Sequence, residues 1–242
     1  MKLLLFDLDG TLVRADGAGR KALNRAICRI YKVRQDASIY ELAGKTDLCN
    51  FSEAITLTTG KRASRAEIDR VHGEYLRWLP HYMRVTLRAK KYKYPRGIRR
   101  LLKRLSAQKG LLLGLGTGNM EQGARIKLEP SGFNKYFKFG GFGSDAYSRP
   151  ALLKTAFRRA KRRPEAKNLR PKDVFVIGDT PLDVSAGKAV GYRTVAVGTG
   201  YSDWSELEAS EPDYIAKDFR DVPTWLKWFG VGAGKKNGGG HG

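Results

Sequence analysis

The chain has 242 residues and 41% of them are hydrophobic, which is enough to bury a substantial core in one large domain or in a domain with an insertion. Its 46 Lys and Arg outnumber its 24 Asp and Glu and give a formal net charge of +22. A surface of that sign attracts anions such as phosphorylated substrates, nucleic acid or acidic membranes, but a general basic bias is an equal alternative, because the basic residues are scattered along the whole chain.

The cysteines indicate a reducing compartment, and the amino-terminal residues bear on the expected location. Cys28 and Cys49 form no C-x-x-C motif and have no His or Cys cluster nearby, so we expect buried free thiols. The first apolar run is too short for a signal peptide, and no stretch of the sequence has the length of a membrane span. The expected location is cytoplasmic.

The first predicted strand ends in two acids. Residues 3–6 form an uninterrupted apolar run, Leu-Leu-Leu-Phe, which is typical of a strand buried on both faces at the centre of a parallel sheet. Asp7 and Asp9 follow at alternate positions, ahead of Gly10. They should lie at the carboxyl end of the strand, where open α/β sheets bind ligands. A turn-forming Asp before Gly is the structural alternative, but such a turn needs only one acid.

Residues 16–90 predict helices and no strand. Apolar residues at helical spacing predict an amphipathic helix over 19–32, and residues 44–47, Gly-Lys-Thr-Asp, separate it from a second helix. Ser64 and Glu67 have the spacing of a capping box and predict the start of a third helix. We expect this segment to be a helical insertion above the carboxyl end of the first strand.

Strands and helices alternate from residue 91 onward. Pro95 precedes a helix with one apolar stripe. The later apolar runs predict strands over 111–115, 137–139, 174–177 and 194–197, with helices over 120–129, 151–161, 184–190 and 225–229. This alternation predicts an α/β fold with a doubly wound parallel sheet. The Gly-rich tail, 230–242, should be disordered.

Polar residues follow three of the predicted strands. Besides the first pair of acids, these are Thr117-Gly118-Asn119 after the second strand, and Asp179 with Asp183 after the strand over 174–177. Because the carboxyl ends of parallel strands meet at one edge, the acids should converge, and a cluster of carboxylates needs a cation to offset their repulsion. Hard oxygen ligands favour Mg²⁺, and the absence of Cys and His from the group argues against zinc.

These motifs resemble the haloacid dehalogenase superfamily, and within it the phosphatases of the phosphoglycolate phosphatase type. The family's D-x-D-G-T-L signature matches residues 7–12, its Ser/Thr motif matches Thr117, and its G-D-x-x-x-D motif matches residues 178–183. The resemblance implies a Rossmann-like core formed by residues 1–15 and 91–229, with residues 16–90 as an inserted small helical cap.

The resemblance also implies a Mg²⁺-dependent phosphatase that acts on a small phosphorylated metabolite. Asp7 would attack phosphorus and form an aspartyl phosphate, and Asp9 would serve as general acid and base. The implied Mg²⁺ site consists of Asp7, Asp9 through its carbonyl, Asp179 and, as the group that orients the metal shell, Asp183.

The phosphate-binding residues implied by the family are Thr117, Gly118, Asn119 and a basic residue. The hydroxyl of Thr117 would donate to a phosphoryl oxygen, and the N–H groups of Gly118 and Asn119 would open a helix as an anion site. Arg149 matches the basic motif and would steady the phosphoryl group. The alternatives are an N-cap role for Thr117, a surface role for Arg149, and Lys154 or Arg158 as the base.

Two residues of the expected cap loop, Lys45 and Thr46, are candidates for substrate specificity, because the corresponding loop of the family faces the leaving group. The alternative for Lys45 is an ordinary solvated lysine.

Other functions stay open. A phosphomutase uses the same acids, whereas a dehalogenase has no need of Asp9 or a metal, and a phosphonatase would use Lys45 for a Schiff base. A basic nucleic-acid-binding protein without turnover is the alternative outside the enzymes. The sequence chooses neither the substrate nor the oligomeric state.

Overall fold

The computed structural model describes residues 1–42 and 44–231, which form a sheet of six strands with every neighbouring pair parallel. The spatial order is β3-β2-β1-β4-β5-β6. β1 is therefore central, as its apolar run predicts, and its residues from Leu3 to Phe6 are fully buried. The strands are β1 Lys2–Phe6, β2 Leu111–Gly116, β3 Gly140–Gly141, β4 Val174–Gly178, β5 Arg193–Val197 and β6 Tyr214–Ala216.

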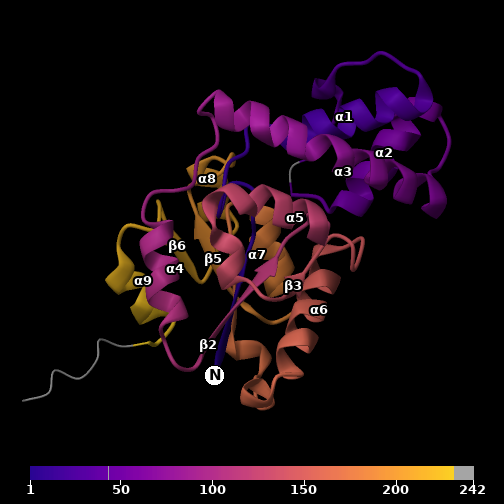
Figure 1. The fold of residues 1–242 in the computed structure, drawn as a ribbon. Helices are drawn as coiled ribbons and strands as arrows, with labels where there is room; N and C mark the ends of the chain where they lie inside the picture. The colour runs from indigo at the N-terminus through magenta and orange to yellow at the C-terminus, as the bar shows by residue number, and fades with distance from the viewer. Residues whose placement is uncertain (43, 232–242) are drawn as a thin grey trace, which may run out of the picture.

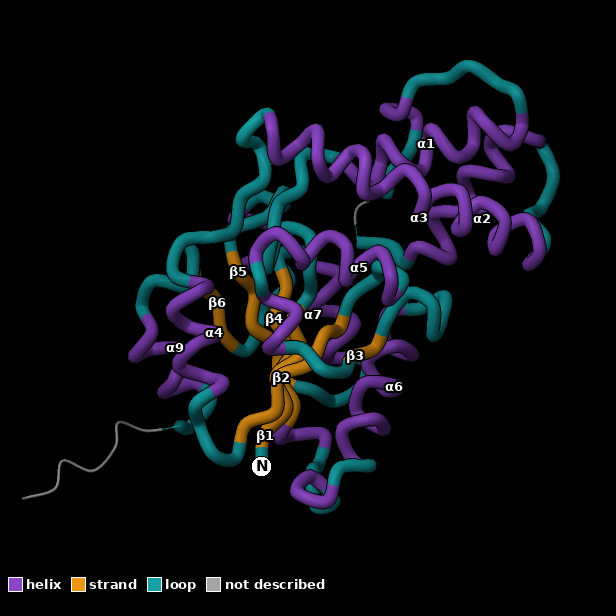
Figure 2. Tube along the Cα trace, viewed as in Figure 1, coloured by secondary structure: helices purple, strands orange, loops and turns teal. Residues whose placement is uncertain are grey.

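Helices cover both faces of this sheet (Figures 1 and 2). Successive side chains of a strand point to opposite faces, so Leu4 and Phe6 pack with α4, α5 and α9, whereas Leu3 and Leu5 pack with α6 and α7. The predicted doubly wound α/β fold is confirmed. The helices of this part are α4 Ile98–Ser106, α5 Glu121–Leu128, α6 Arg149–Lys161, α7 Pro181–Lys188, α8 Trp204–Ala209 and α9 Val222–Trp228.

Three helices lie together beyond the carboxyl ends of the strands, namely α1 Ala18–Tyr31, α2 Asp47–Thr59 and α3 Arg65–Arg88 (Figure 1). We call them the helical group. It has a hydrophobic cluster of its own, apart from those of the sheet, with Ile27 and Phe51 among its members. The capping box predicted at Ser64 and Glu67 is present at the start of α3. The limits of the insertion, 16 and 90, stay a prediction.

The strand predicted over residues 137–139 is wrong, because the chain pairs with β2 only at Gly140 and Gly141. Phe137 is fully buried and its ring packs edge-on against Phe6, with 5.7 Å between the ring centroids. A Cβ on Gly141 would overlap the carbonyl of Leu152 in α6. A Cβ on Gly140 would instead crowd Leu115 of β2. Pairing therefore depends on two residues without side chains, one against β2 and one against α6, which the apolar pattern did not reveal.

Several boundaries also differ from the sequence prediction. α6, α7 and α9 begin two or three residues earlier than expected, and α8 and β6 were not predicted. Both missed elements are short, and they lack the apolar pattern because β6 is only half-buried and Leu207 alone is buried in α8. The tail predicted to be disordered lies outside the described residues, except that the N–H groups of Gly230 and Val231 bond back to α9.

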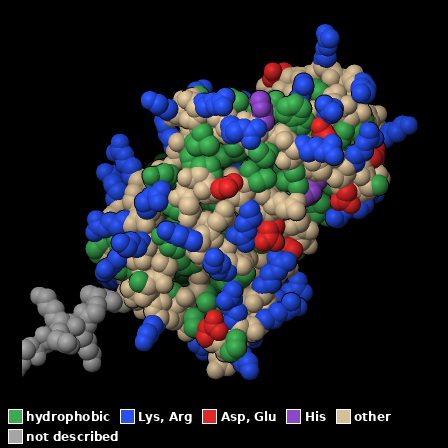
Figure 3. All heavy atoms as spheres, in the orientation of Figure 1, with side chains coloured by type: hydrophobic (Ala, Val, Ile, Leu, Met, Phe, Trp, Pro, Cys, Tyr) green, Lys and Arg blue, Asp and Glu red, His purple; other side chains and the backbone are tan. Residues whose placement is uncertain are grey.

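The basic side chains are spread over the surface. On the face shown in Figure 3, Lys and Arg are distributed over the sheet region and the helical group alike. Within the described residues, no helix combines the length and the apolar character that crossing a bilayer requires. Cys28 and Cys49 are free, as predicted, but they are half-buried instead of buried.

Candidate active site

Three neighbouring strands deliver polar side chains to one edge of the sheet. Asp7 follows β1, Thr117 follows β2 and Asp179 follows β4. The N–H of Asp7 donates to the carbonyl of Ile177 at 2.8 Å, and the N–H of Thr117 donates to that of Gly141 at 3.0 Å. The ladder thus continues past the strand ends and fixes where these side chains leave the sheet.

Three carboxylates meet at this edge. Asp7, Asp179 and Asp183 each present an oxygen within 4.8 Å of the other two, and all three residues are buried. A donor set made only of carboxylate oxygens suits a hard cation such as Mg²⁺. The structure therefore brings together three of the four acids predicted for the metal site.

Burial and mutual repulsion raise the pKa values of two acids in this cluster. Burial, followed by the charge of Asp183, raises the pKa of Asp7 to about 7. Burial and the charges of Asp183 and Asp7 likewise raise the pKa of Asp179 well above its usual range. Asp7 and Asp179 therefore hold their protons to higher pH than ordinary aspartates, unless a bound cation offsets the repulsion.

Two glycines make room for the carboxylate of Asp179. A Cβ on Gly10, where φ is +86°, or on Gly200 would overlap this carboxylate. The hydroxyl of Thr11 donates to Asp179 Oδ1 at 2.7 Å. Thr11 belongs to the D-x-D-G-T-L motif, and the structure shows that it holds an acid of the cluster.

Arg149 contacts the acidic cluster directly. Its Nη2 lies 3.4 Å from Asp7 Oδ1 and also forms an ion pair with Asp183. Only 10% of its side chain is exposed. Lys154 and Arg158, the alternatives on the same helix, are exposed, and Arg158 bonds to the hydroxyl of Thr155. The geometry therefore selects Arg149 among the three basic candidates.

The carboxylate of Asp9 lies in a second network, beside the cluster. Its Oδ2 accepts from Lys127 Nζ at 2.6 Å and from Asn119 Nδ2 at 2.9 Å. Asn119 also donates to Thr117 Oγ1, through Nδ2 at 2.9 Å and through its N–H at 3.2 Å. Asn119 thus contributes its side-chain amide to the site, and its N–H is directed at Thr117.

The sequence analysis did not identify Lys127 as a site residue. In the structure Lys127 is buried, with 7% of its surface exposed. It lies on the same face of α5 as the buried residues Ala124 and Leu128. A lysine inside the apolar stripe of a helix is the signal that could have found it, because a buried ammonium requires an acidic partner.

The loop that carries Lys45 and Thr46 lies against the loop that follows β2. The N–H of Asp47 donates to the carbonyl of Gly118 at 2.7 Å, and the N–H of Met120 donates to Asp47 Oδ2 at 2.8 Å. A Cβ on Gly118 would overlap the carbonyl of Lys45. Asp47, a residue without an assigned role in the sequence analysis, therefore joins the helical group to the start of α5.

Lys45 and Thr46 differ in their surroundings. Lys45 borders the cavity described next, and its Nζ lies 2.6 Å from Glu53 Oε2. Thr46 is buried, caps α2 and donates its hydroxyl to the carbonyl of Tyr147 at 2.9 Å. The side chain of Thr46 is thus held by the backbone.

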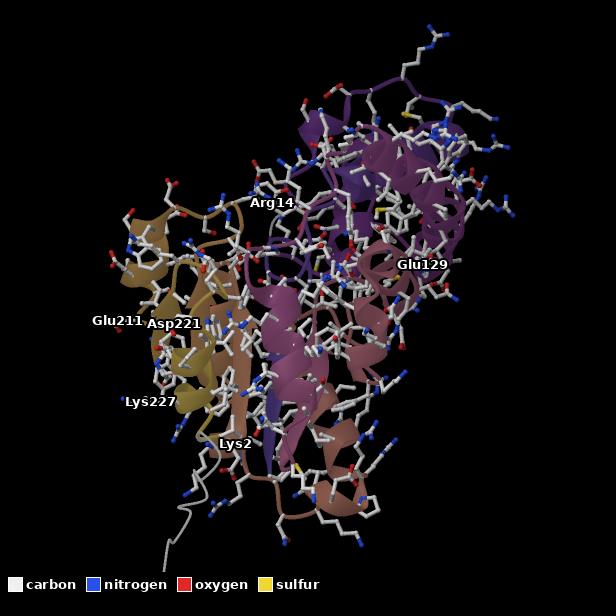
Figure 4. The ribbon with its side chains drawn as sticks, turned by 60° about the vertical axis from the view of Figure 1, so that its left-hand side comes forward. Lys2, Arg14, Glu129, Glu211, Asp221 and Lys227 are labelled. Carbon is white, nitrogen blue, oxygen red and sulfur yellow. The ribbon has the colours of Figure 1, made fainter. Side chains whose placement is uncertain are left out.

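A cavity of about 710 Å³ connects the acids with the helical group. Arg14, which borders the cavity, lies where the sheet meets the helical group. Lys2, at the start of β1, lies at the opposite end of the sheet (Figure 4). The wall combines cations with apolar and aromatic side chains. The lining residues include Asp7, Asp9, Arg14, Arg20, Phe51, Tyr75, Lys127 and Arg149.

A larger and more open groove, of about 1110 Å³, lies elsewhere on the helical group. Arginines from α1 and α3 line it, together with Asp69 and Glu74. None of the predicted site residues borders this groove, so its size does not make it the catalytic candidate.

Comparisons with known proteins identify the family to which the chain is similar. A family model described as haloacid dehalogenase-like hydrolase matches residues 4–197. A phosphoglycolate phosphatase from Rhodospirillum rubrum is 28% identical over 230 residues, covering 93% of this chain and 90% of its own. A bifunctional riboflavin kinase/FMN phosphatase from Arabidopsis thaliana is 27% identical over 195 residues, which are 80% of this chain and 48% of that protein.

Solved structures share the fold. A hydrolase from Pseudomonas syringae has a TM-score of 0.67 at 20% identity, covering 96% of this chain and 100% of its own. A predicted phosphoglycolate phosphatase from Haemophilus somnus has a TM-score of 0.66 at 20% identity, with coverage of 93% and 98%. At these identities the likeness shows the fold alone.

Proposed function

The chain belongs to the haloacid dehalogenase-like hydrolases, and from this membership we propose that it is a Mg²⁺-dependent phosphatase that hydrolyses a small phosphomonoester through an aspartyl phosphate on Asp7. The observation that carries the proposal is the meeting of Asp7, Asp179 and Asp183 beside Arg149. Three buried acids with one arginine form a site that accepts a cation and a phosphoryl group together.

The first step is attack by the carboxylate of Asp7 on phosphorus. A bond forms between an Asp7 oxygen and phosphorus while the bond from phosphorus to the leaving oxygen breaks. Arg149, 3.4 Å from Asp7 Oδ1, supplies positive charge beside the nucleophile and the phosphoryl oxygens. Thr117 Oγ1 already accepts two N–H groups of Asn119, so its own hydrogen is free to be donated to the phosphoryl group.

The cation would be held by the carboxylates of Asp7 and Asp179 and by the carbonyl of Asp9, with Asp183 orienting the surrounding ligands. When bound, Mg²⁺ neutralises charge between the nucleophile and the phosphate. The raised pKa values of Asp7 and Asp179 support this assignment, because burial and the neighbouring acids make their ionised forms unfavourable and a bound cation would offset that cost.

Asp9 completes the reaction as general acid and base. It donates a proton to the departing oxygen and then takes one from the water that hydrolyses the aspartyl phosphate. Its carboxylate borders the cavity and lies outside the acidic cluster. That separation supports a division of roles between the nucleophile and the proton carrier.

The helical group, taken as a cap over residues 16–90, would hold the rest of the substrate. The cavity of about 710 Å³ has the size of a small-metabolite site. Lys45 would contact the leaving group, and the cations Arg14 and Arg20 at the wall favour a substrate with further negative charge. Phosphoglycolate is the first compound to test, since a relative that covers most of this chain is named for it.

The test is phosphate release from phosphoglycolate, FMN and 4-nitrophenyl phosphate, with Mg²⁺ or with EDTA. We expect release only with Mg²⁺ and none from Asp7→Asn. Asp203→Asn is the matched control, because Asp203 is an exposed residue that caps α8 and Asn also caps helices well. Intact hydrolysis by Asp7→Asn would overturn the mechanism.

The same experiment separates the alternatives. A phosphomutase would pass the phosphoryl group to a second hydroxyl with little release of phosphate, and a dehalogenase would release halide from a haloacid without Mg²⁺. A nucleic-acid-binding protein would bind in a salt-sensitive way that Asp7→Asn leaves unchanged.

A further inference from the structure

Lys127 is a buried cation for which the proposed chemistry has no role so far. It comes from α5, on the inner face of a helix that covers the sheet, and 7% of its surface is exposed. Burying an ammonium group is unfavourable unless it is paired and hydrogen-bonded. The hydrogen-bond partners of Lys127 therefore indicate its role.

Those contacts form a closed triangle. Lys127 Nζ donates to Asp9 Oδ2 at 2.6 Å and to Asn119 Oδ1 at 2.7 Å. Asn119 Nδ2 donates in turn to Asp9 Oδ2 at 2.9 Å. The ammonium thus orients the amide of Asn119, with its oxygen toward Lys127 and its nitrogen toward the carboxylate, and both groups bind the same oxygen of Asp9.

This arrangement distinguishes the two oxygens of Asp9. Oδ2 receives both donors, and within the described residues the side-chain hydrogen bonds of this carboxylate all end on Oδ2. Forty per cent of the Asp9 side chain is exposed, and without Lys127 the carboxylate would keep the bond from Asn119 but lose both the ammonium and the contact that orients this amide. Oδ1 is the oxygen left to exchange a proton with the substrate.

We propose that Lys127 is a positioning residue that fixes the carboxylate of Asp9, directly and through Asn119, so that Oδ1 faces the leaving group. In the step it serves, the Asp7 oxygen bonds to phosphorus, the bond to the leaving oxygen breaks, and the proton on Asp9 Oδ1 moves to that oxygen. The inference rests on the proposed function, because it assigns Lys127 to the acid of that reaction.

The alternative is a purely structural role, in which Lys127 fills space in the interior and neutralises the charge of Asp9. The two roles differ in what they do to substrates with different leaving groups. Positioning of the acid matters when the leaving oxygen needs a proton to depart, whereas a loosened fold weakens turnover of every substrate alike. Phenyl phosphate and 4-nitrophenyl phosphate have nearly the same shape, and phenoxide is the far more basic leaving group.

The experiment compares kcat/KM of Lys127→Met and the unaltered chain for these two esters with Mg²⁺. We expect a loss of about 100-fold for phenyl phosphate, the size typical of a misplaced catalytic group, and a loss below about 10-fold for 4-nitrophenyl phosphate. Lys138→Met is the control, because Lys138 is an exposed lysine, and it should change neither value. Methylammonium in the buffer should restore part of the lost activity of Lys127→Ala.

Equal losses on the two esters, or no loss, would overturn the role of Lys127 and leave the phosphatase proposal standing. Hydrolysis of neither ester by the unaltered chain would instead count against the proposed function. A crystal structure of Lys127→Met tests the inference apart from turnover. We expect the Asp9 carboxylate to leave its place beside Asn119, and an unmoved carboxylate would contradict the positioning role.

Discussion

Arg149 Nη2 lies 3.4 Å from Asp7 Oδ1, and nine-tenths of each side chain is buried. The same guanidinium pairs with Asp183, so one cation bridges the proposed nucleophile and a second acid. Charges at such distances interact strongly when little water separates them. The stability and the activity of the site should therefore both depend on Arg149.

Arg149→Met should lower kcat/KM for any phosphomonoester by about 100-fold or more, since it removes positive charge next to the transferring group. It should also lower the melting temperature more at pH 8 than at pH 5, because Asp7, whose pKa is raised to about 7, is ionised at the higher pH and loses the positive charge beside it. Thermal unfolding at the two pH values measures this difference. An equal decrease at both would show that Arg149 does not offset these carboxylates.

Stability without metal should fall as pH rises from 5 to 8. The pKa of Asp7 is raised from 3.8 to about 7 by burial and by Asp183, and that of Asp179 is raised as well. The folded chain thus holds protons that the unfolded chain has released, and this contribution to stability is lost as pH passes through the folded pKa values. The expected loss is roughly 2 to 4 kcal/mol in the free energy of unfolding.

Magnesium reverses this trend if it binds the three acids. Added Mg²⁺ should raise the melting temperature more at pH 8 than at pH 5, because it replaces the protons that leave. Denaturant titrations of the Mg²⁺-free chain and of Asp7→Asn give the comparison. The variant should show a flatter dependence on pH, and an unchanged dependence would place the titrating groups elsewhere.

Substitutions of the neighbouring residues Thr46 and Lys45 should affect different properties, namely stability and substrate preference. Thr46→Ala should lower the free energy of unfolding by about 1 to 2 kcal/mol, as for other lost helix caps, since Thr46 caps α2 and bonds to the carbonyl of Tyr147. Lys45→Ala should leave stability nearly unchanged and alter the order of preference among substrates. Thr46→Ser is the matched control, and equal losses on all substrates from Lys45→Ala would refute a specificity role.

Gly200→Ala should remove Mg²⁺-dependent activity, because its Cβ would overlap the carboxylate of Asp179. The variant should also lose stability, since the added methyl group would meet Cγ and Cβ of the buried Asp179 as well as its carboxylate oxygen. Circular dichroism and Mg²⁺ binding by calorimetry test the two statements. Gly73→Ala is the control, because a Cβ there meets nothing within 4 Å, and its activity should match that of the unaltered chain.

The sequence alone determined the central strand, the order of the motifs and the class of fold. Leu3 to Phe6 have no polar alternation, which is typical of a strand buried on both faces. The acids and Thr117 follow predicted strands, and parallel strands bring such positions to one edge whatever the details of packing. These properties are local, or follow from the chain direction, and can be read from the order of residues.

The tertiary structure decided which of those side chains touch. Asp183 lies with Asp7 and Asp179 in the cluster. Asp9 is only two residues from Asp7, but its carboxylate bonds to Lys127 of α5. The strand at Gly140 and Gly141 likewise depends on how closely α6 approaches. The contacts of Asp7 and Asp9 join residues more than a hundred positions apart. They follow from the sheet register and helix packing, which no local pattern of residues contains.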